Sequence, residues 1–130
     1  MVDVYSEWAG PCNAMANYLK KIKLEVGDEV LQCAMANCDS IEALSMFRGH
    51  CKPIWLFIIS GQTVEVMHGS NAPLLGRIIQ NQMEKMKTGE PITQANQDKL
   101  KFPSIQEDSL LLITKFSLRQ FFNFSTSALR

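Results

Sequence analysis

Four cysteines, at positions 12, 33, 38 and 51, are the residues of this sequence best suited to covalent chemistry. Cys12 follows the tetrapeptide Trp-Ala-Gly-Pro, and Cys51 lies next to His50. A thiol reacts as its thiolate, which a neighbouring protonated histidine stabilises. The spacing of the cysteines from the histidines matches no zinc-binding pattern. We therefore expect thiol chemistry at Cys12 or Cys51, or two thiols that only pack, with no metal ion and no cofactor.

The composition is typical of a single globular domain. The chain has 130 residues, of which 46% are hydrophobic and 20% are charged, as in ordinary folded proteins. Thirteen basic and thirteen acidic residues cancel, so no basic stripe indicates binding to nucleic acid or to a membrane surface. The first residues, MVDVYSEW, have neither the basic nor the apolar region of a secretory signal. We expect a cytoplasmic protein with reduced thiols.

A strand and a helix should position Cys12. Residues 2–5 (VDVY) are rich in β-forming side chains and lead directly into Trp-Ala-Gly-Pro, which indicates a tight turn. Proline suits a first helical turn, and apolar residues follow it at three- and four-residue spacings. The pattern predicts a helix from about Pro11 to Gly27. A second strand is predicted at 30–36, and a short helix within 41–48.

The second half of the folded region should contain a hairpin and a helix. The apolar run at 54–59 (IWLFII) predicts a buried strand, and residues 60–62 (SGQ) are typical of a turn. Residues 63–67 (TVEVM) alternate as a half-buried partner strand. Residues 74–87 place apolar side chains on one face of an amphipathic helix that Gly89 ends.

The segment from Asp3 to Cys12 (DVYSEWAGPC) resembles the thioredoxin signature, in which a strand ends in Trp-Cys-Gly-Pro-Cys. Only the first cysteine differs. Lys52-Pro53, the turn at Gly61 and His68-Gly69 agree with this family in order and spacing. The segments FRGHCKP (47–53) and NAPLL (71–75) look most like the thioredoxin domain fused to nucleoside diphosphate kinase domains in sperm-tail and ciliary proteins.

The resemblance covers about residues 2–88, and nothing after them resembles a kinase domain. It implies an α/β thioredoxin-like fold with a central mixed sheet flanked by helices. The sequence begins at what would be the central strand, so the family's first strand and first helix are missing from this expectation. Their loss would expose a sheet edge and uncover part of one face.

The resemblance also implies roles for individual residues. Cys12 matches the resolving cysteine, whereas Ala9 replaces the nucleophile, so exchange with a substrate disulfide cannot begin in the usual way. Asp3 aligns with the buried acid that serves the resolving thiol, or it is a structural relic. Pro53 matches a cis-proline beside the groove that binds extended peptides. The groove residues by resemblance are Trp8, Gly10, Pro11, Lys52, Pro53 and Gly69.

Three segments are expected: a thioredoxin-like domain at 1–88, a polar linker at 89–108, and an apolar tail at 109–130. We expect the tail to be disordered or isoform-specific, with a partner-binding amphipathic helix as the alternative. Lys115, Arg119 and Asn123 interrupt it before the ~20 apolar residues that a membrane span needs.

Three functional hypotheses follow. The first is a redox-inactive or redox-impaired module that binds proteins; by resemblance its partners are axonemal or microtubule-associated, in a cilium or flagellum. The second is a disulfide oxidoreductase that acts through Cys12 with Cys51. The third is a truncated isoform without a stable independent function. Family analogy alone carries the cellular setting.

Overall fold

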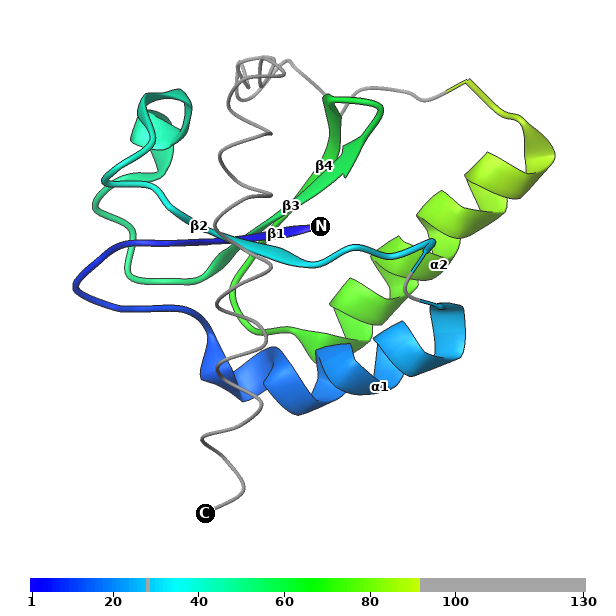
Figure 1. The fold of residues 1–130 in the computed structure, drawn as a ribbon, viewed down its shortest axis with the longest axis horizontal. Coiled ribbons are helices and arrows are strands. Elements are labelled where there is room, and N and C mark those ends of the chain that lie inside the picture. The colour runs from blue at the N-terminus through cyan, green and yellow to red at the C-terminus, as the bar shows by residue number, and fades with distance from the viewer. Residues whose placement is uncertain (28, 92–130) are drawn as a thin grey trace.

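The structure is a computed structural model that describes residues 1–27 and 29–91. Four strands form one mixed sheet in the order β2-β1-β3-β4 (Figure 1). The predicted tail at 109–130, and the predicted linker beyond residue 91, lie outside the described residues. The elements are β1 (Val2–Tyr5), η1 (Asn13–Met15), α1 (Ala16–Val26), β2 (Ala34–Asn37), η2 (Glu42–Phe47), β3 (Ile54–Ile59), β4 (Gln62–His68) and α2 (Ala72–Thr88), where η denotes a 3₁₀ helix.

The pairing of the strands is that of a thioredoxin-like α/β fold. Strand β1 is central, parallel to β2 and antiparallel to β3, and β3 and β4 form the hairpin. Asp3 lies opposite Met35 on one side and opposite Trp55 on the other. Side chains of directly opposed residues on neighbouring strands point to the same face of a sheet, so these three residues share one face.

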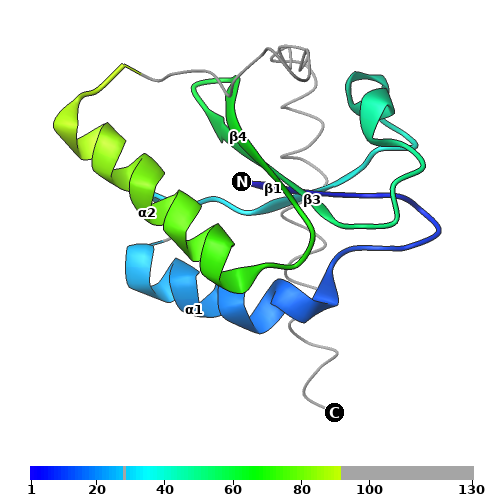
Figure 2. The same cartoon turned by 180° about the vertical axis from the view of Figure 1, so that it is seen from behind.

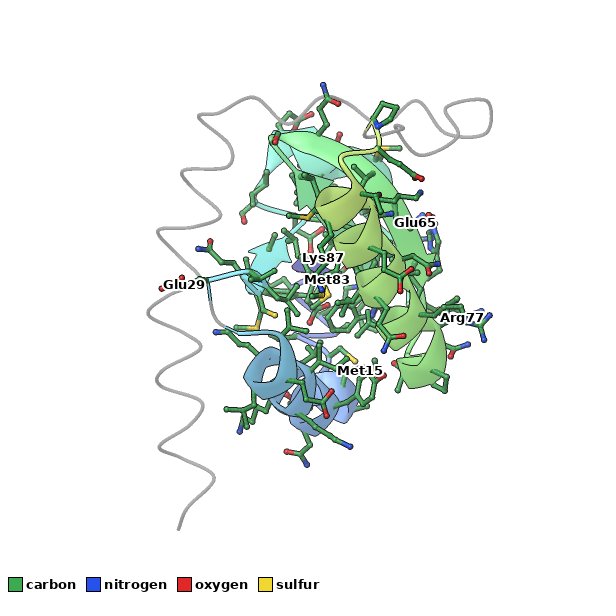
Figure 3. The ribbon with its side chains drawn as sticks, turned by 90° about the vertical axis from the view of Figure 1, so that its right-hand side faces the viewer. Met15, Glu29, Glu65, Arg77, Met83 and Lys87 are labelled. Carbon is green, nitrogen blue, oxygen red and sulfur yellow. The ribbon has the colours of Figure 1, made fainter. Side chains whose placement is uncertain are left out.

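Two apolar clusters lie on the two faces of the sheet. One joins β1, β2 and β3 to η2, and the other joins β3 and β4 to α1 and α2. Figure 2 shows both long helices on the same side of the sheet. All side chains from Ile54 to Phe57 are buried, which explains why β3 is a continuous apolar run. In Figure 3, Met15 lies in the interior by α1 and Arg77 points outward from α2.

Three predicted boundaries needed correction. The predicted strand at 30–36 is shorter and later, because the amides of Val30 and Leu31 donate to the carbonyl of Gly27 in the turn that follows α1. The helix predicted from Pro11 begins later, since Cys12 is extended (φ −74°, ψ 100°). The short helix within 41–48 is a 3₁₀ helix. No helix among the described residues is both long and apolar enough to cross a membrane.

Asn71 caps α2. Its side-chain Oδ1 accepts a hydrogen bond from the amide of Leu74 at 3.0 Å, and a proline lies in the first helical turn. The exposed helix N-terminus would otherwise leave that amide to water. Helix α2 carries Leu75 and Ile79 into the core, so its start also fixes the packing of one sheet face.

We expect Asn71→Ala to lower the free energy of unfolding by about 1 kcal/mol, because it removes the capping acceptor. Urea unfolding followed by circular dichroism measures the loss. Asn71→Asp is the matched control, because it keeps a capping oxygen and should change stability by less than half as much. Equal stability of the alanine variant and the parent would contradict the assignment of this cap.

Candidate functional site

The loop after β1 holds Ala9 at the surface. The amides of Ala9 and Gly10 both donate to the carbonyl of Ser6 at 3.0 Å, which closes the turn. Gly10 has φ +70°, a conformation that favours glycine. The amide of Glu7 donates to Asp39 Oδ2 at 2.7 Å and ties the turn to the end of β2. The position that lacks the attacking sulfur is therefore exposed and held by backbone hydrogen bonds.

Cys12 is shielded by comparison. Its side chain is half-buried and packs at the margin of the cluster formed with α1 and α2. Its Sγ lies 3.5 Å from the hydroxyl of Ser70, and its amide donates to Asp3 Oδ2 at 2.9 Å. Cys12 is thus placed to attack a sulfur that has already been brought to the loop, and poorly placed to meet a substrate first.

Asp3 is a buried acid beneath Cys12. The residue is only 5% exposed. Burial raises the pKa of its carboxyl to about 6, and the hydrogen bond from the Cys12 amide opposes this rise. Its other oxygen, Oδ1, is buried and has no hydrogen-bond partner among the described residues. A buried polar atom without a partner is uncommon in folded proteins.

The loop at 50–53 faces the loop at 6–12, which we call the motif loop. The amide of Gly69 donates to the carbonyl of Pro53 at 2.8 Å, and the indole Nε1 of Trp55 donates to the carbonyl of Gly69 at 3.1 Å. The prediction of a cis bond before Pro53 was wrong, because no peptide bond among the described residues is cis. The trans form is the one that the proline amide itself favours, by about 0.5–1 kcal/mol.

The two loops enclose a pocket of about 170 Å³, which we call the motif groove. Three thiols line it: half-buried Cys12, buried Cys38 and exposed Cys51. Trp8 and Gly69, which were predicted to belong to the groove, do not line this pocket. Trp8 is 69% exposed, and the amide of Gly69 is hydrogen-bonded to the carbonyl of Pro53. The predicted residues that line the groove are Ala9, Gly10, Pro11, Cys12, Cys51, Lys52 and Pro53.

Several residues of the groove lining escaped prediction as parts of the site, and two of them, Cys38 and Ser70, carry groups close to its chemistry. Cys38 counts among the four cysteines, but its position after β2 gives no sign that it reaches the groove. Ser70 contacts Cys12 across 58 positions of sequence, and only the neighbouring His68-Gly69 motif could have drawn attention to it. Among residues 1–27 and 29–91, no three His, Cys, Asp or Glu side chains gather to hold a metal ion.

The motif loop has no exposed thiol, whereas the facing loop has one. A substrate disulfide must first meet an accessible thiolate. At the position of the attacking cysteine, the motif loop has the methyl group of Ala9, and its one thiol, that of Cys12, is half-buried. On the facing loop, Cys51 is the one exposed thiol among the four cysteines.

The chain matches several curated proteins over about two thirds of its length. It is 41% identical over 87 residues to human thioredoxin domain-containing protein 6, which covers 67% of this chain and 26% of that protein. For the Xenopus laevis protein of the same name the identity is 42%, over 67% of this chain and 14% of the relative. The thioredoxin domain-containing protein 3 homolog of Ciona intestinalis is 37% identical over 109 residues, which are 84% of this chain and 16% of that protein.

This chain therefore spans about a quarter or less of the length of these relatives. No family model matches it.

Proposed function

The chain contains a thioredoxin-like domain, and from this premise we propose that the domain is a redox-impaired module that binds protein partners through the motif groove. The single observation that carries the proposal is the exposed methyl group of Ala9 in front of the shielded Cys12 thiol. An extended peptide can still enter a groove between two loops, since backbone hydrogen bonds and side-chain pockets need no sulfur.

Exposed Trp8 precedes Ala9, a residue of the groove lining, and we expect it to supply an apolar anchor. Tryptophan is enriched at protein interfaces because it combines a large apolar surface with one hydrogen-bond donor. Lys52 lines the groove on the opposite loop and is exposed. A partner segment with an apolar side chain and an acidic side chain suits this pair.

We test redox impairment by insulin reduction with dithiothreitol, after cooperative unfolding shows that the purified chain folds. The parent should not raise the rate above that of dithiothreitol alone, and Cys12→Ser should leave the rate unchanged. Turnover by the parent that disappears in Cys12→Ser would overturn the proposal. Non-cooperative melting would instead favour the hypothesis of a truncated isoform without a stable fold.

A second candidate, a disulfide oxidoreductase, is favoured by the presence of Cys12 and Cys51 on one groove. The Cys51 thiolate would attack a substrate disulfide, form a mixed disulfide and release one substrate thiolate. The Cys12 thiolate would then attack the Cys51 sulfur and release the second substrate thiolate, leaving a Cys12–Cys51 disulfide for dithiothreitol to reduce. Loss of insulin turnover in both Cys12→Ser and Cys51→Ser would establish this function.

The cellular setting that we propose is the cytoplasm of a cilium or flagellum, with axonemal or microtubule-associated partners. The support is the resemblance of segments 47–53 and 71–75 to the sperm-tail and ciliary fusion proteins. Imaging of the tagged full chain in ciliated cells tests this setting, and uniform exclusion from cilia would contradict it.

A further inference from the structure

A further pocket lies beside the place where the described chain ends. Its volume is about 250 Å³, and we call it the terminal pocket. The second half of α2, the end of β3 and the loop that follows α1 supply its walls, together with Met1. It shares no lining residue with the motif groove, so what it binds is independent of the proposed function.

The walls of the terminal pocket are mostly apolar. Phe57 and Ile79 are buried members of the cluster formed with α1 and α2, and half-buried Met83 faces the body of the domain (Figure 3). Val30 and Met86 also line the pocket, yet they are 53% and 54% exposed. A single exposed apolar side chain is ordinary, whereas several around one pocket mark an interaction site.

The chain leaves α2 next to this pocket. The amides of Gly89 and Glu90 both donate to the carbonyl of Lys85, and Gly89 has φ +66°, so the helix ends at a left-handed glycine. Pro91 is the last described residue and follows Met86 by five positions. Five residues span at most about 18 Å, so the rest of the chain starts within that distance of the pocket wall.

The tail at 109–130 contains a segment that suits the pocket. Residues 110–116 (LLLITKF) begin with four consecutive aliphatic side chains. Residues 92–109 join this segment to Pro91 and can span about 60 Å, whereas a domain of this size has a radius of gyration of about 12 Å. A covalent tether of this length holds the segment at an effective concentration on the order of millimolar. At micromolar protein concentration, the tail of the same chain therefore occupies the pocket in preference to a second copy.

The charges of the pocket and of the tail are complementary. Glu29 is exposed, and it is the one charged side chain among the described residues that line the pocket. Every charged residue within 109–130 is basic, and the first of them, Lys115, lies in the apolar segment. A carboxylate beside an apolar pocket favours an apolar segment that carries a cation over one that carries an acid.

We propose that the terminal pocket binds residues 110–116 of the same chain. The aliphatic side chains of the segment cover Val30 and Met86, and Lys115 pairs with Glu29. The domain thereby docks its own tail on a surface distinct from the motif groove.

Trypsin cleavage of the full chain tests this contact, because two Lys–Phe bonds form a matched pair. The bond between Lys101 and Phe102 precedes the segment, and the bond between Lys115 and Phe116 lies within it. A docked segment does not enter the protease, so cleavage after Lys115 follows the undocked fraction. The ratio of cleavage after Lys115 to cleavage after Lys101 should be about tenfold lower in the parent than in a chain whose pocket is blocked.

Two pocket variants supply the blocked state. Met86→Asp and Val30→Asp place a charge in the pocket, and each should raise the ratio about tenfold. Leu24→Asp is the matched control, because Leu24 is an 87% exposed apolar residue near the end of α1 that does not line the pocket. It should leave the ratio unchanged. A ratio that is the same in the parent and in folded pocket variants would overturn the proposal.

Tail variants give a second readout that leaves the sequence of the described domain unaltered. The full chain is labelled with carbon-13 at its methionine methyl groups and followed by NMR. The double variant Leu111→Asp, Ile113→Asp should shift the methyl signal of Met86, whereas Ser125→Asp, Ser127→Asp should leave it in place. An unmoved signal in the first variant would overturn the proposal.

Dilution separates docking within one chain from association of two chains. The cleavage ratio of the parent should stay constant when the protein is diluted about a hundredfold, because the tether fixes the effective concentration. A ratio that rises on dilution would assign the pocket to a second copy and overturn docking within one chain.

Discussion

Replacing Asp3 with asparagine is expected to stabilise the domain by about 2–3 kcal/mol at pH 8. Burial raises the pKa of this carboxyl from 3.8 to about 6, and each unit of difference corresponds to ~1.4 kcal/mol. Asparagine keeps an oxygen for the Cys12 amide and carries no charge. The variant therefore removes the cost of ionising a buried group while it retains the hydrogen bond.

The sign of the pH dependence follows from the raised pKa. Below the unfolded value, the carboxyl is protonated in both states and costs nothing. As the pH rises through 3.8 to about 6, the unfolded chain ionises first, so the folded state loses stability until the folded carboxyl has ionised too. The parent should therefore lose about 2–3 kcal/mol across this window relative to Asp3→Asn, and the difference should be constant above about pH 7.

Urea unfolding of both proteins between pH 3 and 8 measures this difference, and two-state behaviour must hold at each pH. Glu84→Gln serves as the matched control, because an exposed carboxylate should change stability by less than ~0.5 kcal/mol at every pH. If the difference in stability between the parent and Asp3→Asn is the same at every pH, ionisation of Asp3 does not destabilise the folded state, and the prediction is wrong.

Restoring a sulfur at position 9 is the change with the largest expected effect on activity. Ala9→Cys should raise insulin turnover by about two orders of magnitude or more, because it supplies the nucleophile that the motif loop lacks. Ala9 is exposed, and its amide is held by the carbonyl of Ser6. The substitution adds one sulfur to an existing side chain without altering that hydrogen bond.

The restored activity must depend on Cys12. In the double variant Ala9→Cys, Cys12→Ser, the first attack proceeds but the mixed disulfide is not resolved. A covalent adduct with insulin, visible by non-reducing electrophoresis, should therefore accumulate. Asn81→Cys adds an exposed thiol on α2, outside the lining of the motif groove, and serves as a control for a merely added thiol. An Ala9→Cys variant that folds but remains inert would show that the loop does not present position 9 to a substrate.

The sequence predicted the central strand, the hairpin and α2 because each has a strong local pattern. The helical spacing after Pro73 agrees with the burial of Leu75 and Ile79. The alternation predicted for residues 63–67 is broken: Val64 and Met67 are buried in one apolar cluster, whereas Val66 packs against the other. The pairing of β3 with β4 has a register shift in this region, which interrupts the two-residue period. The start of β2 was mispredicted because Val30 and Leu31 favour a strand, whereas their amides close a turn on Gly27. Local propensity does not report which carbonyl an amide reaches.

The motif in the sequence predicted part of the candidate site. The remaining site residues are brought together by contacts between distant parts of the chain. Residues 9–12 and 51–53 share a groove, as their match to the thioredoxin pattern implied. The contact of Ser70 with Cys12 and the position of Cys38 depend on how four strands pair, which no short motif states. The unpartnered Oδ1 of Asp3 depends on the absence of a donor, a property that only packing decides.

The two tryptophans differ in solvent exposure, so their fluorescence can report on two different regions of the protein. Trp8 is 69% exposed and directly precedes Ala9 of the groove lining, whereas Trp55 is 1% exposed and hydrogen-bonded to Gly69. Iodide in solution should quench the red-shifted emission of Trp8 and leave the blue-shifted emission of Trp55 almost intact. Occupancy of the groove and loss of the fold should thus appear as two separate fluorescence changes in the unmodified protein.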